Sequence, residues 1–239
     1  MKLAIIGYGK MGKIIESLAI ERGHDIVAIL DKQNASDVNS EKFAQADAAI
    51  EFTEPESALD NFLACFRQNV PVVSGTTGWL DMYETVVQEC KKQNGAFFYA
   101  SNFSIGVNIL FEMNRKLASL MDRFPQYKAM IEETHHIHKL DAPSGTAISL
   151  AKDLVLENSK LHSWKRSEDK PDENSLPVKS LREGEVFGEH AVQYESDVDI
   201  IELKHKAKNR KGFALGAIMA AEFIQNKKGI FSMKDMLSI

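Results

Sequence analysis

Hydrophobic and polar positions alternate along the first third of the chain as short apolar runs and amphipathic stretches. Residues 3–6 form an apolar run that stops at glycines, and residues 25–30 form a second run. Between them, residues 12–22 carry apolar side chains at helical spacing. Short apolar runs are typical of buried parallel strands, and a spacing of three or four is typical of amphipathic helices. Strand, helix and strand within about 30 residues predict a βαβ unit.

The same alternation continues after the second run. We expect further strands at residues 48–52, 70–74 and 96–100, and helices at residues 55–68 and 80–93. Repeated strand-helix units place successive strands side by side in one direction, with the helices covering both faces. The pattern therefore predicts an α/β fold with a Rossmann-type, doubly wound parallel sheet.

The rhythm changes near residue 105. Longer amphipathic stretches, alternating runs joined by short turns and one polar segment follow. The predicted elements are helices at residues 107–121, 146–157 and 213–224, strands at residues 127–140, 178–181, 190–194 and 199–205, and a surface loop at residues 158–177. The last three strands suit an antiparallel meander. We expect a dinucleotide-binding domain at residues 1–105 and an α+β domain with a mostly antiparallel sheet at residues 106–209.

Composition narrows the function classes. The net charge of −5 over 239 residues argues against a general nucleic-acid role, because proteins that bind nucleic acids present basic surfaces. The N-terminal apolar run is too short for a signal peptide or a membrane span, so we expect a cytoplasmic protein that uses no membrane. Cys65 and Cys90 lack metal-like spacing and fit reduced thiols in a reducing compartment.

The turn after the first strand reads "GYGKMG" and carries Gly7, Gly9 and Gly12. In a dinucleotide fold the first glycine allows the tight turn, the second lets backbone approach the pyrophosphate, and the third lets helix pack on strand. Asp31 ends the second strand, 19 residues beyond Gly12, where a carboxylate accepts hydrogen bonds from the ribose hydroxyls. A glycine-rich turn without a ligand is the alternative interpretation.

Charge near this loop bears on which nucleotide binds. Asp31 repels a 2′-phosphate, which favours NADH, but Lys32 follows it and softens that repulsion, so NADPH stays open. Lys10 is a candidate phosphate contact, or a solvated surface lysine. "SGTTGW" follows another predicted strand, and the carboxyl ends of parallel strands line the ligand crevice. Gly75, Thr76 and Thr77 are therefore candidates for the nicotinamide side, or for a helix-capping turn.

Residues 134–147 read "THHIHKLDAPSGTA". Three histidines suggest a metal site, but adjacent strand residues point to opposite faces and no other ligand has a companion spacing. A surface cluster without a role is a second alternative. The interpretation that we favour is a proton-transfer and anion site without metal, because histidine titrates near neutral pH and lysine supplies a fixed charge or an acid.

An anion receptor is predicted just beyond the histidines. Ser144 is a candidate N-cap of the next helix, and its hydroxyl, Thr146 and the N–H groups of the first turn suit a carboxylate. Two anion-binding devices within a dozen residues suggest a small substrate with two carboxylates. A hydride acceptor of that kind, with a protonatable atom, would use both devices.

These residues resemble a known family. "EETHHIHKLDAPSGTA", "SGTTGW", "ASNFSIGVN" and "REGEVFGEH" are similar to motifs of the dihydrodipicolinate (4-hydroxy-tetrahydrodipicolinate) reductases of lysine and diaminopimelate biosynthesis. The resemblance spans nearly the whole chain. It implies that NADH or NADPH delivers hydride to a cyclic imine dicarboxylate and gives tetrahydrodipicolinate. It also implies a homotetramer built through the substrate-domain sheets of residues 106–209, with residues 210–239 returning to the nucleotide domain.

The resemblance also implies residue roles. His135 and Lys139 are the expected catalytic residues, His135 as proton donor or acceptor and Lys139 as proton donor. The expected substrate ligands are His136, Ser144, Gly145 and Thr146. The expected cofactor ligands are Gly7, Tyr8, Gly9, Lys10, Met11, Gly12, Asp31, Lys32, Phe52, Gly75, Thr76, Thr77, Ala100, Ser101, Asn102 and Phe103.

Some features depart from the family's pattern. Lys10 stands where many members have arginine in a phosphate loop one residue longer, and Glu54 occupies a position that is often basic. In a continuous strand, His135 and Lys139 share one face and His136 lies on the other, so using all three requires the strand to end or bend here.

Two other function classes compete with the reductase. One is a different nicotinamide enzyme, such as a semialdehyde or amino-acid dehydrogenase. A phosphorylating semialdehyde dehydrogenase needs a nucleophilic cysteine, whereas Cys65 and Cys90 fall inside predicted helices. The other is a non-enzymatic nucleotide sensor, which would leave the histidines without a role.

Overall fold

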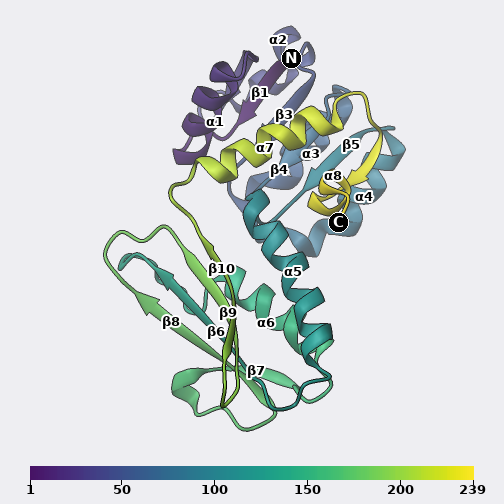
Figure 1. The fold of residues 1–239 in the computed structure, drawn as a ribbon. Helices are drawn as coiled ribbons and strands as arrows, with labels where there is room; N and C mark the ends of the chain where they lie inside the picture. The colour runs from purple at the N-terminus through teal and green to yellow at the C-terminus, as the bar shows by residue number, and fades with distance from the viewer. The chain divides into compact units, whose positions relative to one another are not determined.

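The computed structural model describes residues 1–239, and the chain divides into two compact units (Figure 1). The first unit comprises Met1–Ser104 together with Lys211–Ile239, and the second comprises Ile105–Arg210. The chain thus leaves the first unit once and returns to it. No helix has both the length and the apolar character that a membrane span requires.

The first unit is built on a six-stranded sheet in which every pairing is parallel. Its strand order is β11-β5-β4-β3-β1-β2. The strands are β1 (Lys2–Ile6), β2 (Asp25–Leu30), β3 (Ala48–Glu51), β4 (Val72–Ser74), β5 (Ala96–Tyr99) and β11 (Gly229–Phe231). β1 and β3 are almost wholly buried, as expected for strands with helices on both faces. The predicted doubly wound parallel sheet is confirmed.

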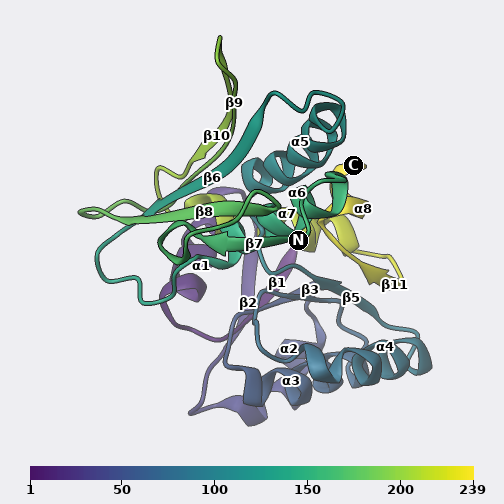
Figure 2. The same ribbon diagram turned by 90° about the horizontal axis from the view of Figure 1, so that it is seen from below.

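Helices cover the two faces of this sheet (Figure 2). The α-helices are α1 (Lys10–Glu21), α2 (Glu41–Ala44), α3 (Pro55–Arg67), α4 (Tyr83–Lys92), α7 (Lys211–Ile224) and α8 (Met233–Leu237). Helices α1 and α7 contact each other on one face, whereas α3 and α4 contact each other on the opposite face. Helix α7 is rich in alanine and buried along its length, as the sequence predicted. At Gly216 an added Cβ would lie 1.8 Å from the Phe103 carbonyl oxygen, so α7 needs glycine there.

The second unit contains a five-stranded mixed sheet with the order β10-β9-β6-β8-β7. Its strands are β6 (Lys128–His135), β7 (Ser163–Arg166), β8 (Ser175–Arg182), β9 (Glu189–Glu195) and β10 (Ile200–Lys206). Helices α5 (Ile105–Met121) and α6 (Gly145–Glu157) contact each other and join the sheet in one apolar core. Leu150, Leu154, Ile131 and Val192 are fully buried in that core.

Three predictions for this unit were wrong. The β8, β9 and β10 strands do not form a meander, because β8 pairs with β6 in parallel while β9 pairs antiparallel with β6 and β10. The sheet is therefore mixed, with two parallel and two antiparallel pairings. Residues 158–177 are not only a loop, since they include β7 and the start of β8. The strand expected at residues 127–140 ends at His135.

Candidate functional site

The phosphate loop occupies the turn between β1 and α1. Gly7 has φ +95°, and an added Cβ there would lie 2.0 Å from the Phe52 carbonyl oxygen. At Gly12 an added Cβ would lie 2.2 Å from the Gly7 oxygen. Gly9, by contrast, would place a Cβ in open space and is the N-cap of α1, without a side-chain cap. Gly7 and Gly12 are needed for packing, whereas Gly9 leaves backbone open to an incoming phosphate.

A pocket of about 440 Å³ opens beside this loop. It brings together six of the expected cofactor residues: Gly7, Tyr8, Gly9, Asp31, Lys32 and Phe52. The other ten expected residues do not line it: Lys10, Met11, Gly12, Gly75, Thr76, Thr77, Ala100, Ser101, Asn102 and Phe103. The pocket has the ingredients of an adenosine site, namely an apolar wall, a strand-end carboxylate and a helix N-terminus.

Charges at the mouth of the pocket are paired. Lys32 Nζ lies 2.9 Å from both carboxylate oxygens of Glu54, and this hydrogen-bonded pairing raises the pKa of the lysine. Asp31 accepts a hydrogen bond from the Gln33 amide at 2.8 Å. Glu54, which occupies a position that is often basic in the family, therefore pairs directly with Lys32.

One of the remaining nucleotide-side residues, Thr76, contacts a buried carboxylate that the sequence analysis missed. Glu51 is fully buried at the end of β3 and accepts hydrogen bonds from Ser74 Oγ at 2.6 Å and Thr76 Oγ1 at 2.8 Å. Burial raises its pKa despite these hydrogen bonds. The signal was a lone acid inside the apolar run "AAIEF". Thr76 Oγ1 also accepts a hydrogen bond from the Thr53 amide at 2.8 Å, so Glu51 and Thr76 together tie the loops after β3 and β4.

The aromatic and glycine residues of this region pack closely. The Phe52 and Phe103 rings lie 5.8 Å apart, and a Cβ added at Gly75 would lie 2.2 Å from the Phe52 ring. Gly75 is therefore required for contact with Phe52. Thr77 is exposed, and Ala100 is buried. Cys65 and Cys90 are free, buried and inside α3 and α4, so neither can serve as the nucleophile of a semialdehyde dehydrogenase.

The histidine-lysine stretch begins where β6 ends. Because the strand stops at His135, strand alternation no longer requires His136 to point away from His135 and Lys139. The His136 and His138 rings lie 6.1 Å apart. Lys139 Nζ hydrogen-bonds to both carboxylate oxygens of Asp141, at 2.7 and 2.8 Å, and this contact lowers the pKa of Asp141.

The start of α6 has the predicted cap. Ser144 Oγ accepts a hydrogen bond from the Ala147 amide at 3.2 Å and lies 3.1 Å from His190 Nε2. Ser144 is buried between the helix start and the histidine. Gly145 has no neighbour within 4 Å of an added Cβ, which leaves room for a carboxylate at the N-terminus of the helix.

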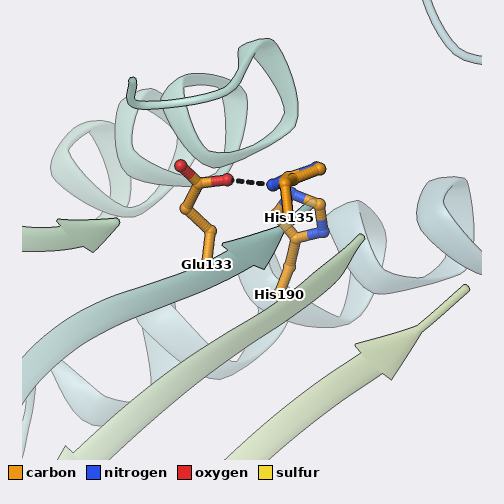
Figure 3. A group of neighbouring side chains, drawn as sticks. All are labelled: Glu133, His135 and His190. Carbon is orange, nitrogen blue, oxygen red and sulfur yellow. Dashed lines mark ion pairs between the residues drawn. The ribbon is translucent and has the colours of Figure 1, made fainter. Parts of the chain in front are cut away.

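A buried triad lies beside this helix start (Figure 3). Glu133 and His135 lie two residues apart on the helix-covered face of β6, and a Glu133 carboxylate oxygen forms an ion pair with His135 Nδ1. His190 stands opposite Glu133 on β9, and its ring centroid lies 5.1 Å from that of His135. All three residues are at most 8% exposed.

Two residues of the triad, Glu133 and His190, have lowered pKa values. Burial alone would raise the pKa of Glu133, but hydrogen bonds from His135 and Ser180 and the charge of Arg182 lower it to about 2. Burial, together with the charge of neighbouring His135, lowers the pKa of His190 to about 3. At neutral pH the group therefore contains a carboxylate and a neutral imidazole on either side of His135.

A metal ion is the competing occupant of this triad, since ligand atoms of Glu133, His135 and His190 lie within 4.8 Å of one another. The donor set suits zinc. However, one Glu133 oxygen lies 3.1 Å from Arg182 Nη2, the other pairs with His135, and His190 Nε2 contacts Ser144. A guanidinium at this distance repels a divalent cation and occupies the carboxylate that would bind it. The neighbours fit an organic site better than a metal centre.

Sequence reasoning missed Glu133, Arg182 and His190 as functional residues. Glu133 had a local signal, because a residue two positions before His135 on a strand shares its face. Arg182 and His190 are the first and last residues of the "REGEVFGEH" motif, but nothing local connected that motif to Glu133, since the two segments meet only through strand pairing.

The fold and site together define a pyridine-nucleotide-dependent reductase. Comparison with known proteins places the chain within that class. Residues 1–103 match the family model "Dihydrodipicolinate reductase, N-terminus" and residues 106–237 match "Dihydrodipicolinate reductase, C-terminus". The chain belongs to the dihydrodipicolinate reductase family.

Full-length relatives agree with this placement. The 4-hydroxy-tetrahydrodipicolinate reductase of Christiangramia forsetii is 50% identical over 239 residues, covering all of this chain and 98% of the relative. The enzyme of the same name from Neisseria meningitidis is 29% identical over 272 residues, with the same coverage. A dipicolinate-bound dihydrodipicolinate reductase structure from Paenisporosarcina sp. superposes with a TM-score of 0.77, at 23% identity and 98% coverage of both chains, and supports the fold.

Proposed function

We propose that this protein reduces 4-hydroxy-tetrahydrodipicolinate, or dihydrodipicolinate, to tetrahydrodipicolinate with NADH or NADPH, in lysine and diaminopimelate biosynthesis. The observation that carries the proposal is the juxtaposition of the Glu133–His135 pair with the capped N-terminus of α6. That arrangement offers a proton-transfer group beside a receptor for a carboxylate. The 50% identical relative has the same activity in its name.

The bound nucleotide supplies a hydride when the substrate is in place. Gly7 and Gly12 make the close turn that a dinucleotide loop needs, Gly9 leaves its backbone open, and Asp31 follows β2, where the ribose hydroxyls lie in such folds. Lys10, Met11 and Tyr8 lie in the same loop, with Gly75–Thr77 and Ala100–Phe103 after β4 and β5. The family uses a pyridine nucleotide.

The 4-hydroxy substrate must first lose its hydroxyl group as water to give dihydrodipicolinate. Addition of a hydride to dihydrodipicolinate then leaves the product one proton short. In our proposal Lys139 donates that proton, and His135 exchanges a proton at the same site. Asp141 holds the Lys139 ammonium at 2.7 Å before substrate arrives. His136, Gly145 and Thr146 bind a substrate carboxylate, supported by the helix N-terminus, which favours negative charge. No metal ion takes part.

NADH is the preferred nucleotide in this proposal. Asp31 repels a 2′-phosphate, and Lys32, which would attract it, is neutralised by Glu54.

The second unit is proposed to build a homotetramer through the face of its sheet that α5 and α6 leave open. The mass of the protein in solution, measured by light scattering after gel filtration, tests the proposed homotetramer directly.

The activity is tested by following NADH and NADPH oxidation with the dipicolinate precursor, with and without pyridine-2,6-dicarboxylate, a planar mimic of the substrate. We expect precursor-dependent oxidation that the mimic inhibits competitively. Absence of oxidation with both nucleotides would defeat the proposal. Oxidation of another substrate instead would indicate a different nicotinamide enzyme, and nucleotide binding without any turnover would indicate a sensor.

A further inference from the structure

The Glu133 carboxylate is the centre of a hydrogen-bond network in the second unit. It is 0% exposed, so its charge must be compensated by nearby donors. The Ser180 hydroxyl contributes to that compensation, and three further groups belong to the proposed site. His135 Nδ1 pairs with one oxygen, while Arg182 Nη2 at 3.1 Å and the Ser144 amide at 3.3 Å contact the other.

Each partner carries a different part of the site. His135 is the proposed proton-exchange group. Ser144 caps α6 through the Ala147 amide and so fixes the carboxylate receptor. Arg182 donates hydrogen bonds to the carbonyl oxygens of Lys139 at 3.3 Å and Asp141 at 2.6 Å, which fixes the loop that carries the proposed proton donor. One buried carboxylate therefore connects all three parts.

The same contact selects the state of the His135 ring. A carboxylate beside Nδ1 favours the tautomer with a proton on Nδ1 and leaves Nε2 to exchange protons. Glu133 stays ionised across the working pH range, because its pKa is held near 2.

We propose that Glu133 is a positioning residue for the reaction: it fixes the tautomer and orientation of His135 and holds that ring in register with the α6 carboxylate receptor and the Lys139 loop. The proposal rests on the proposed role of His135. His190 supports it from the opposite side, since a neutral imidazole there does not compete for the Glu133 charge.

The first test needs no variant and no turnover. Nitrogen-15 NMR of histidine-labelled wild-type protein, with the His135 signal assigned by its loss in His135→Gln, reports which ring nitrogen is protonated. We expect a proton on Nδ1 in the neutral ring. A neutral ring protonated on Nε2 alone would overturn the proposal even if the enzyme is an active reductase.

The second test compares Glu133→Gln with a matched control. Asp153→Asn also removes a carboxylate that pairs with an arginine of the second unit, Arg115 at 2.9 Å, but one far along α6 from the site. For Glu133→Gln we expect kcat to fall by roughly 100-fold, the scale of losses when a group that orients a histidine is removed. The Kd for NADH should be unchanged, and Asp153→Asn should keep wild-type kcat.

Rescue by a conservative variant distinguishes positioning from loss of folded protein. Glu133→Asp keeps the carboxylate and should restore part of the kcat that Glu133→Gln loses, and both variants should keep the wild-type Kd for NADH. A kcat in Glu133→Asp as low as that of Glu133→Gln would contradict the proposal.

Failure of this proposal and failure of the proposed function are distinguishable. If wild-type protein does not turn over the dipicolinate precursor, the function is wrong, whereas the NMR result still decides whether Glu133 sets the His135 tautomer. If turnover is normal and Glu133→Gln keeps wild-type kcat, the function holds and the positioning role is refuted.

Discussion

The nucleotide loop of the first unit and the histidine site of the second unit are built in different ways. In our proposal the loop binds the nucleotide through its backbone, and the three glycines on which this depends, Gly7, Gly9 and Gly12, lie within six consecutive residues. The histidine site works through side chains that come from three strands and a helix start, with Glu133 and His190 brought together by strand pairing. A backbone site is broken by adding a carbon atom, whereas a side-chain site is broken by removing a charge.

The largest expected effect is at Gly7. Gly7→Ala places a Cβ 2.0 Å from the Phe52 carbonyl oxygen at φ +95°, so we expect a loss of about 3 kcal/mol or more in the free energy of unfolding. Gly9→Ala is the matched control, because its Cβ meets nothing within 4 Å. Its free energy of unfolding should stay within about 0.5 kcal/mol of the wild-type value. It should, however, bind NADH more weakly. Equal melting temperatures for the two variants would refute the distinction.

A smaller effect is expected at His190, where it depends on pH. The pKa of His190 is about 3 in the folded protein, below its ordinary value of 6.5, so the unfolded chain binds the extra proton. The stability that this difference provides is present above pH 6.5 and is lost as the pH falls towards 3. In His190→Gln the melting temperature should therefore fall less steeply over that interval. Each kcal/mol of stability that no longer depends on pH should reduce the fall by about 2–4 °C. Parallel curves would show that His190 titrates normally in the fold.

The smallest effect is at the nucleotide mouth. Glu54→Gln frees Lys32 from its ion pair, and we expect KM for NADPH to fall by at most about fivefold, since exposed ion pairs contribute up to about 1 kcal/mol. KM for NADH should not change. Adding Lys32→Ala to Glu54→Gln should abolish the gain. An unchanged KM for NADPH in the single variant would show that the pair does not bear on nucleotide choice.

The same contrast explains what the sequence could reveal. Local patterns sufficed for the parallel sheet, the phosphate loop and the Ser144 cap, because each depends on neighbouring residues. The β7 strand was missed because Trp164 and its polar neighbours form a strand only by pairing with residues 175–178, and β11 was missed because three residues give no periodic signal. The parallel pairing of β8 with β6 likewise depends on contacts between distant segments.

The candidate site divides in the same way. His135, His136 and Lys139 could be singled out because they are adjacent in the chain. That all three can serve one site follows from the end of β6 at His135, which no alternation predicted. Arg182 lies 49 residues from Glu133, and only the register of β6 with β8 brings it to the carboxylate.

We propose that the second unit carries the proton chemistry and that the first unit binds the nucleotide. Lys139→Ala tests it most directly, with kcat and the Kd for NADH measured on the same preparation. The account predicts that turnover of the dipicolinate precursor is lost while the Kd for NADH equals that of the wild type. Normal turnover in Lys139→Ala would contradict it.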